Sequence, residues 1–210
     1  MPGLLAQVGL ESWWAEAFTE QERALIRDRY KIVGVIVGVD AGQSPLEECN
    51  YTLKVLSDVS LASGIANLFQ KRGERHIAYK ALEKAECLVS SETPILDVHF
   101  FLHSKIETIY RDDTLVDGRL HCMEACQQQI AIAPLAAAAF REEYKGPLVE
   151  HSGYKRLTML LEHQAAFLEC ARVCYEALEA GWAGDWAVRA ARCEMRHNKT
   201  LAKGVTKSKL

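Results

Sequence analysis

The sequence predicts an all-α fold, and three observations lead to that prediction. Only 5 Pro and 13 Gly occur in 210 residues, so few positions interrupt regular structure. Ala, Leu, Glu and Lys, which favour helices, are abundant. Apolar residues recur every three or four positions along most of the chain, which is the spacing of a helix face. Because 49% of the residues are hydrophobic and 25% are charged, as in typical globular proteins, we expect the helices to enclose one large core or two small ones.

Charge, cysteine content and hydropathy limit the partners and the compartment. The formal net charge of −3 and the lack of a long basic stripe argue against nucleic-acid binding. Seven cysteines, an odd number in a chain that can fold without disulfides, indicate a reducing compartment. The longest apolar run, residues 32–39, is shorter than the roughly 18 residues that cross a bilayer, and the first residues lack the pattern of a secretory signal. We therefore predict a cytoplasmic protein with no membrane partner.

Residues 198–210 are predicted to form a basic, flexible tail. This tail ends in Ser208-Lys209-Leu210, the tripeptide that the peroxisomal import receptor reads when it is C-terminal and exposed. If the host is a eukaryote, the peroxisome is the alternative to the cytoplasm.

Residues 1–43 are predicted to form Trp-rich helices followed by a Gly-rich linker. The first helix has an aromatic face at helical spacing, made of Leu10, Trp13, Trp14, Ala17 and Phe18. Thr19 and Glu22 then form a capping-box pattern, which predicts a second helix over residues 20–31. Three glycines at intervals of four, between residues 32 and 43, indicate an interhelical linker or at most a short strand.

A further long helix is predicted to begin at Ser44, with a break expected near residues 57–63. Ser44 is a favourable N-cap, Pro45 suits the first turn, and the carboxylates of Glu47 and Glu48 favour the positive end of the helix dipole. This helix opens a domain over residues 44–197, in which the chain begins to repeat itself near residue 59.

Three segments of this domain, at about 59–92, 96–134 and 151–184, share one pattern. In the first segment the pattern consists of Ile65, Ala66, Phe69, Gly73, Ala78, Leu82 and Ala85. In the third segment Leu157, Thr158, Leu161, Ala165, Cys170, Cys174 and Ala177 stand at identical spacings. The second segment is less regular because extra residues follow its first helix near Asp112. Small residues let two helices approach, larger apolar residues fill the groove, and Gly or Ala occupies the turn, so each segment predicts a helical hairpin.

This spacing resembles the tetratricopeptide repeat, a helical hairpin of about 34 residues with small and aromatic residues at these offsets. The resemblance covers residues 59–184, apart from an interruption at 135–150 where we expect a short helix. It implies a right-handed superhelical stack of antiparallel hairpins, with the N-terminal helices as an extension and a capping helix at 185–196 over the last apolar face. It also implies that a peptide or protein partner binds in the concave groove.

In such a stack the first helix of each hairpin lines the groove. The residues that the resemblance places there are Asn67, Gln70, Lys71, Lys105, Thr108, Lys155, Arg156 and Met159. Asn67, Lys155 and Arg156 are similar to the amide and basic residues with which some tetratricopeptide domains hold the terminal carboxylate of a peptide. Ser63 departs from that pattern, which has Lys at this place. Solvated basic side chains on an exposed helix face are the alternative interpretation.

His99 and His103, with Glu107 one turn further on, suggest a second function, a small metal-dependent or metal-binding helical enzyme. Phe100 stands where the helix of a zinc protease has Glu, so polar residues at a helix rim are the simpler interpretation. His151 precedes the predicted start of a helix, and we expect it to support that turn.

Two pairs of cysteines stand four residues apart, Cys122 with Cys126 and Cys170 with Cys174. This spacing puts two thiols on one helix face, but structural zinc sites usually pair Cys-x-x-Cys motifs. Each cysteine also occupies a position where the hairpin pattern favours a small residue, so we expect all four to pack as small hydrophobes.

The sequence has no phosphate-binding loop, nucleophile motif or dinucleotide fingerprint. We therefore predict a non-catalytic scaffold that binds a peptide or protein partner without a cofactor or a metal. Its oligomeric state, monomer or homodimer, stays open, because apolar surface on the Trp-rich helices or the last helix could join two chains.

Overall fold

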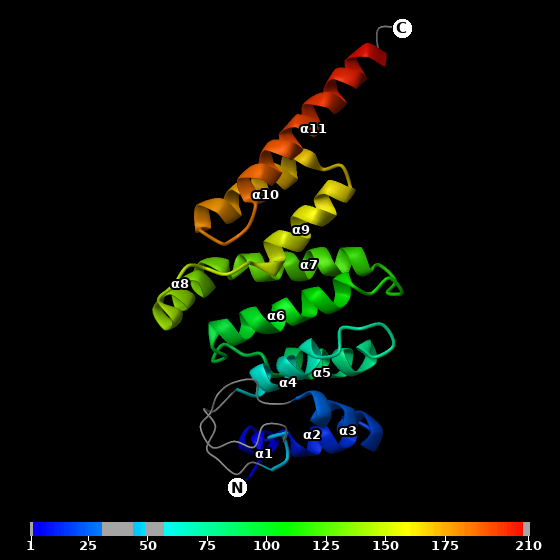
Figure 1. Ribbon diagram of the computed structural model, residues 1–210, viewed down its shortest axis with the longest axis vertical. Coiled ribbons are helices and arrows are strands. Elements are labelled where there is room, and N and C mark those ends of the chain that lie inside the picture. Colours follow the sequence, from blue (N-terminus) through cyan, green and yellow to red (C-terminus); the bar gives the residue numbers. More distant parts are fainter. Residues whose placement is uncertain (1, 31–43, 49–56, 208–210) are drawn as a thin grey trace. The chain divides into compact units, whose positions relative to one another are not determined.

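The computed structural model describes residues 2–30, 44–48 and 57–207 (Figure 1). Within these ranges the chain forms eleven helices, and its extended backbone makes only isolated bridge pairs. In chain order the helices are α1 (Leu4–Gln7), α2 (Glu11–Ala17), α3 (Glu20–Arg29), α4 (Asp58–Asn67), α5 (Arg75–Leu88), α6 (Ile95–Tyr110), α7 (Gly118–Ala131), α8 (Ala133–Tyr144), α9 (Ser152–His163), α10 (Phe167–Ala180) and α11 (Trp186–Lys207). The all-α prediction is confirmed.

The chain divides into two compact units, unit 1 over Met1–Arg111 and unit 2 over Asp112–Leu210. Unit 1 contains α1 to α6, and unit 2 contains α7 to α11. The boundary between the units falls inside the predicted second repeat, 96–134. It coincides with the long turn after α6, the same extra residues that made this repeat irregular in the sequence.

The first predicted hairpin is formed by α4 and α5, and α6 packs against both of them. The pattern residues of this hairpin are buried, with the large Phe69 and Ile65 beside the small Ala66 and Ala78. Small side chains at the contact let the two helices approach, and the aromatic ring fills the remaining space. The sequence pattern therefore located the inner faces of both helices correctly.

The third predicted hairpin is formed by α9 and α10, and α11 packs along α10. Here too the pattern positions are buried, among them Leu157, Leu161, Cys170 and Cys174. Helix α11 buries Trp186 and other residues at the contact, as expected of a capping helix. The further stacking of hairpins into a right-handed superhelix stays a prediction.

The turns of these two hairpins share a left-handed backbone at the same pattern position. Gly73 has φ +88° and Ala165 has φ +58°. Left-handed backbone suits glycine, whereas the Cβ of other residues meets the following carbonyl oxygen. The third hairpin therefore carries a local strain that the first avoids.

Exchanging these two residues should change stability in opposite directions. We expect Gly73→Ala to lower the free energy of unfolding by about 1 kcal/mol and Ala165→Gly to raise it by roughly 0.5 to 1 kcal/mol. A Cβ at Gly73 would meet no atom within 4 Å, so backbone strain alone is tested there. Urea unfolding of both variants measures the effect, and two changes of the same sign would contradict this explanation.

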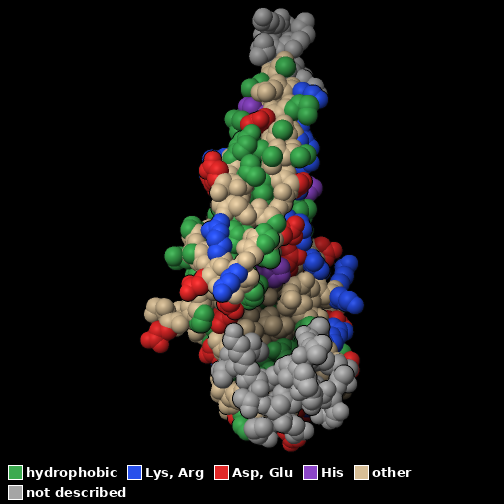
Figure 2. Space-filling model, turned by 60° about the vertical axis from the view of Figure 1, so that its left-hand side comes forward, with side chains coloured by type: hydrophobic (Ala, Val, Ile, Leu, Met, Phe, Trp, Pro, Cys, Tyr) green, Lys and Arg blue, Asp and Glu red, His purple; other side chains and the backbone are tan. Residues whose placement is uncertain are grey.

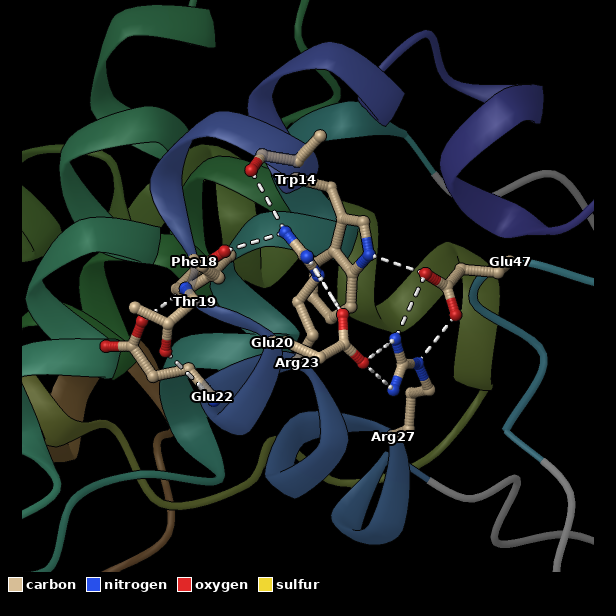
Figure 3. Close-up of polar contacts among 9 residues, drawn as sticks. Trp14, Phe18, Thr19, Glu20, Glu22, Arg23, Arg27 and Glu47 are labelled. Atoms are coloured by element: carbon tan, nitrogen blue, oxygen red, sulfur yellow. Dashed lines mark hydrogen bonds and ion pairs between the residues drawn. The ribbon is translucent and has the colours of Figure 1, made fainter.

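A network of hydrogen bonds and ion pairs holds the N-terminal helices together (Figure 3). Thr19 and Glu22 form the predicted capping box at the start of α3. Trp14 Nε1 donates to Glu47 Oε1 at 2.9 Å, and Arg27 Nε donates to Glu47 Oε2 at 2.6 Å. Arg23 Nη1 donates to the carbonyl oxygen of Phe18 at 2.7 Å. Glu47, which is distant in sequence, thus joins α2 to α3.

Helix α3 is tied to the first hairpin by ion pairs. Glu22 Oε1 lies 2.8 Å from Lys80 Nζ on α5, and Arg29 Nη2 lies 2.6 Å from Glu74 Oε1. Burial alone would raise the pKa of Glu22, but hydrogen bonds from Lys80 and Thr19 outweigh burial and lower it from 4.5 to about 2. The N-terminal helices therefore belong to unit 1, as the expected extension of the first hairpin.

Residues 45–48 differ from the prediction that a helix begins at Ser44. They form a turn and an isolated bridge, and α4 begins only at Asp58, with Ser57 as its N-cap. The carbonyl oxygens of Pro45 and Leu46 accept hydrogen bonds from the backbone of α1, at 2.9 and 3.0 Å. These long-range bonds outcompete the local signals for a helix start. The predicted Gly-rich linker lies outside the described residues.

The C-terminal region also differs from its prediction. Helix α11 continues to Lys207, so residues 198–207 are helical where we expected a flexible tail. The tripeptide Ser208-Lys209-Leu210 lies outside the described residues. The short helix expected in the interruption is present as α8, and no helix in the described part of the chain is long and apolar enough to cross a bilayer.

Candidate functional site

Helix α9 positions three of the predicted groove residues, Lys155, Arg156 and Met159. Its N-cap is His151, whose Nδ1 accepts a hydrogen bond from the backbone N–H of Tyr154 at 3.3 Å, so His151 supports this turn as expected. The other side of α9 is buried against α7 and α10. Lys155, Arg156 and Met159 lie away from this packed side and are half-exposed.

The half-exposed side chains of α9 form a surface that is both basic and polarizable. Arg156 Nη1 lies 3.6 Å from Met159 Sδ. Lys155 Nζ forms an ion pair with Glu150 Oε1 at 2.7 Å, at the surface of the same unit. Two adjacent cations can bind an anionic group through charge-assisted hydrogen bonds, and the thioether offers an adaptable apolar contact. We call Lys155, Arg156 and Met159 the α9 surface.

A second group of predicted groove residues lies at the C-terminal end of α4 in unit 1. Asn67 and Lys71 are exposed, and Gln70 is half-buried. Gln70 Nε2 donates to Asn67 Oδ1 at 2.7 Å, so the two amides support each other. The structure therefore brings Asn67 and Gln70 together near the surface, and Lys71 is exposed one residue further on.

The predicted groove residues of α6 have different positions. Lys105 is half-exposed, with its Nζ 2.6 Å from Glu86 Oε1 and 5.8 Å from the ring centroid of Phe101. Thr108 is fully buried, and its Oγ1 donates to the carbonyl oxygen of Ser104 at 2.8 Å. The prediction that Thr108 lines a groove is wrong, because the packing of α6 against α4 and α5 turns this face inward. Ser63 is buried for the same reason.

The predicted groove residues thus divide between the two units. Asn67, Gln70, Lys71 and Lys105 belong to unit 1, and the α9 surface belongs to unit 2. A single groove that includes both groups stays a prediction.

Comparisons with protein-family models, with curated proteins and with solved structures give no match. The resemblance to the tetratricopeptide repeat therefore rests on the residue pattern and on the two hairpins that this pattern predicted.

The His99 and His103 pair differs from an exposed metal-binding stripe. His99 is 3% exposed, and burial, with the charge of His103 as a second cause, lowers its pKa from 6.5 to about 4. Its imidazole is therefore neutral at pH 7. Within the described part of the chain, one group of His, Cys, Asp or Glu side chains lies close enough together to share a metal ion. This group is in unit 2 and does not include His99 or His103.

The cysteine pairs are buried as expected of small packing residues. Cys122 and Cys126 lie inside α7, and Cys170 and Cys174 lie inside α10. The sequence did not single out Cys193, which the structure places 3.2 Å from Cys170, sulfur to sulfur.

Glu162, near the end of α9, also lies beside Cys193, with its Oε1 3.2 Å from the Cys193 sulfur. No short motif connects these residues, because they come from three different helices. The helical spacing of Trp186, Ala190 and Cys193 could have shown that Cys193 faces the core, but it could not have identified its neighbours.

Proposed function

We propose that the chain is a non-catalytic helical-repeat module that binds a peptide or protein partner. The α9 surface carries this proposal, because its two cations and its thioether stand together on one half-exposed helix. The buried side of the same helix is held by the neighbouring α7 and α10, so the binding groups stand on a rigid element.

The chemistry of the α9 surface favours a partner with a free carboxylate, either a chain terminus or an acidic side chain. Arg156 can donate two parallel hydrogen bonds to a carboxylate, and Lys155 can add a third. Lys155 already pairs with Glu150 at 2.7 Å, so an incoming carboxylate takes over a contact that an exposed glutamate makes in the free protein. Since exposed ion pairs contribute only about 0 to 1 kcal/mol, this exchange costs little.

Exposed apolar side chains in the same unit support binding of a macromolecule rather than a small ion. On α10 and α11 these side chains are Leu168, Tyr175, Leu178, Val188, Met195 and Leu201. Figure 2 shows hydrophobic side chains between charged ones along the upper part of the molecule, where these helices lie. Apolar groups framed by charges are typical of surfaces that bind proteins.

A double substitution in the α9 surface tests the proposal. We expect Lys155→Ala combined with Arg156→Ala to weaken binding of peptides with a free terminal carboxylate at least tenfold, because all three charge-assisted hydrogen bonds are lost. A peptide array with free and amidated C-termini, followed by fluorescence anisotropy on the peptides that bind, measures this change.

The matched control is Arg119→Ala combined with Lys199→Ala, which removes two exposed cations from the same unit. This variant should bind as the wild type does. An equal loss of peptide affinity in both variants would show that net charge alone causes the effect. No loss of affinity in the α9 variant would show that the α9 surface is not part of the binding site. In either case circular dichroism shows whether the helices are intact.

A further inference from the structure

Three side chains from three helices of unit 2 meet in a cluster that the binding function does not use. Glu162 comes from α9, Cys170 from α10 and Cys193 from α11, and their potential ligand atoms all lie within 4.8 Å of one another. Both cysteines are fully buried, and the Glu162 side chain is 16% exposed. We call these three residues the thiol–carboxylate cluster.

Two of the three atom pairs of the cluster lie near the separation that a small metal ion requires, and the third pair lies within 4.8 Å. Cys193 Sγ lies 3.2 Å from both Cys170 Sγ and Glu162 Oε1. Ligand atoms around a tetrahedral ion with metal–sulfur bonds of about 2.3 Å are roughly 3.5 to 3.8 Å apart. An opening of the cluster by about half an ångström therefore makes room for the ion, which rotation of two thiol side chains can supply.

The surroundings of Glu162 hold its carboxylate in place and ionised. Arg192 donates to Glu162 Oε1 through Nε at 3.1 Å and Nη2 at 2.8 Å, and Arg189 Nη1 lies 3.5 Å from Oε2. Burial raises the pKa of Glu162, but the hydrogen bonds from Arg192 and Cys193 outweigh burial and keep that pKa below its ordinary value. Hydrogen-bonded partners of this kind commonly orient the carboxylate ligands of metal sites.

The charges of the site balance when a divalent ion replaces the two thiol protons. Without the ion, one carboxylate and two guanidinium groups give the site a net charge of about +1, since buried thiols are neutral. An ion of charge +2 bound by two thiolates, with release of two protons, leaves that net charge unchanged. The net charge of the buried site therefore does not rise when the ion binds. Burying additional positive charge is the usual obstacle to placing a cation among arginines, and it does not arise here.

We propose that Glu162, Cys170 and Cys193 bind a thiophilic divalent cation of the zinc class. Two thiolates and one carboxylate form a ligand set that favours zinc over magnesium or calcium, which prefer oxygen alone. The three protein ligands leave a fourth tetrahedral position for a further donor such as water. The ion links α9, α10 and α11, so it fastens the third hairpin to its capping helix.

Cadmium titration of the full chain, reduced and stripped of metal with a chelator, tests this proposal. We expect one cadmium ion per chain, an ultraviolet cadmium–thiolate charge-transfer band, displacement of cadmium by zinc, and a higher melting temperature with either ion. Cys170→Ser and Cys193→Ser should each weaken cadmium binding at least tenfold. Cys126→Ser, a buried thiol of α7 in the same unit, is the matched control and should leave affinity unchanged.

Glu162→Gln supplies a second readout that does not depend on altering a fully buried residue. It should keep the charge-transfer band and weaken affinity about tenfold, because one ligand loses its charge while both thiolates remain. The proposal is overturned by the absence of the band in the wild type, by its persistence at full affinity in both cysteine variants, or by equal loss in Cys126→Ser. An unchanged affinity in Glu162→Gln overturns the three-residue assignment.

Discussion

Replacing Gly153 with alanine should lower the free energy of unfolding by about 3 kcal/mol, through overpacking and the loss of a buried hydrogen bond. Gly153 stands in the first turn of α9, where this helix crosses α7. A Cβ on Gly153 would lie 2.9 Å from the carbonyl oxygen of Cys126 and 3.0 Å from Gln129 Oε1. The first of these atoms belongs to the backbone of α7, so it cannot move without displacing that helix.

The hydrogen bond at risk is made by the backbone of Gly153 itself. Its N–H donates to Gln129 Oε1 at 2.7 Å, and the Gln129 side chain is fully buried. Moving α9 away from α7 to relieve the clash stretches this bond and leaves a buried amide poorly satisfied. The clash and the weakened hydrogen bond both destabilise the folded protein, so we expect a large loss of stability from one added methyl group.

Chemical unfolding of Gly153→Ala, followed by circular dichroism, measures this loss. Gly146→Ala is the matched control, since a Cβ at Gly146 would be no closer than 3.7 Å to its nearest neighbour. The two variants make the same chemical change in the same unit. If both lose the same stability, the close approach of α7 and α9 does not depend on glycine.

Acidification from pH 6.5 to pH 4 should cost the folded protein up to about 3 kcal/mol at a single residue, His99. Burial lowers the pKa of this imidazole from 6.5 to about 4. Well above pH 6.5 the imidazole is neutral in both the folded and the unfolded state, so it has no effect on how stability changes with pH. As the pH falls, the unfolded chain accepts a proton that folded His99 does not, so stability decreases until the pH reaches about 4.

Urea unfolding at pH 7 and pH 4.5 tests this expectation in the wild type and in His99→Asn. The variant should lose less stability between these two pH values, whatever its stability at pH 7, because asparagine does not titrate. His163→Asn, at an exposed position of α9, should behave as the wild type does. Equal acid sensitivity of all three proteins would contradict the burial of a neutral His99.

The sequence predicted the helices whose signals are local and repeated. The capping box at Thr19, the turn at Gly73 and the small residues of the first and third hairpins depend on neighbours within a few positions, so their pattern could be recognised without a structure. The turn after Ser44 could not be predicted in this way. Its backbone pairs with residues more than forty positions away, and no local signal records that pairing.

The candidate sites show the same distinction. The resemblance to the tetratricopeptide repeat placed Lys155 and Arg156 at a surface, where both are half-exposed, but it also placed Thr108 in the groove, although Thr108 is fully buried. Thr108 satisfies its hydroxyl on its own helix and can therefore be buried. The thiol–carboxylate cluster was missed since three helices must pack before its residues meet.

The position of the boundary between the units has a consequence for biosynthesis. Residues up to Arg111 contain all the partners of the ion pairs that join α3 to α5, so unit 1 can complete its contacts while α7 to α11 are still being translated. In unit 2, by contrast, α10 packs against α11, which follows it in the chain, so α10 cannot complete this contact before α11 has been translated. Until α11 has been translated, the face of α10 that α11 covers therefore stays exposed.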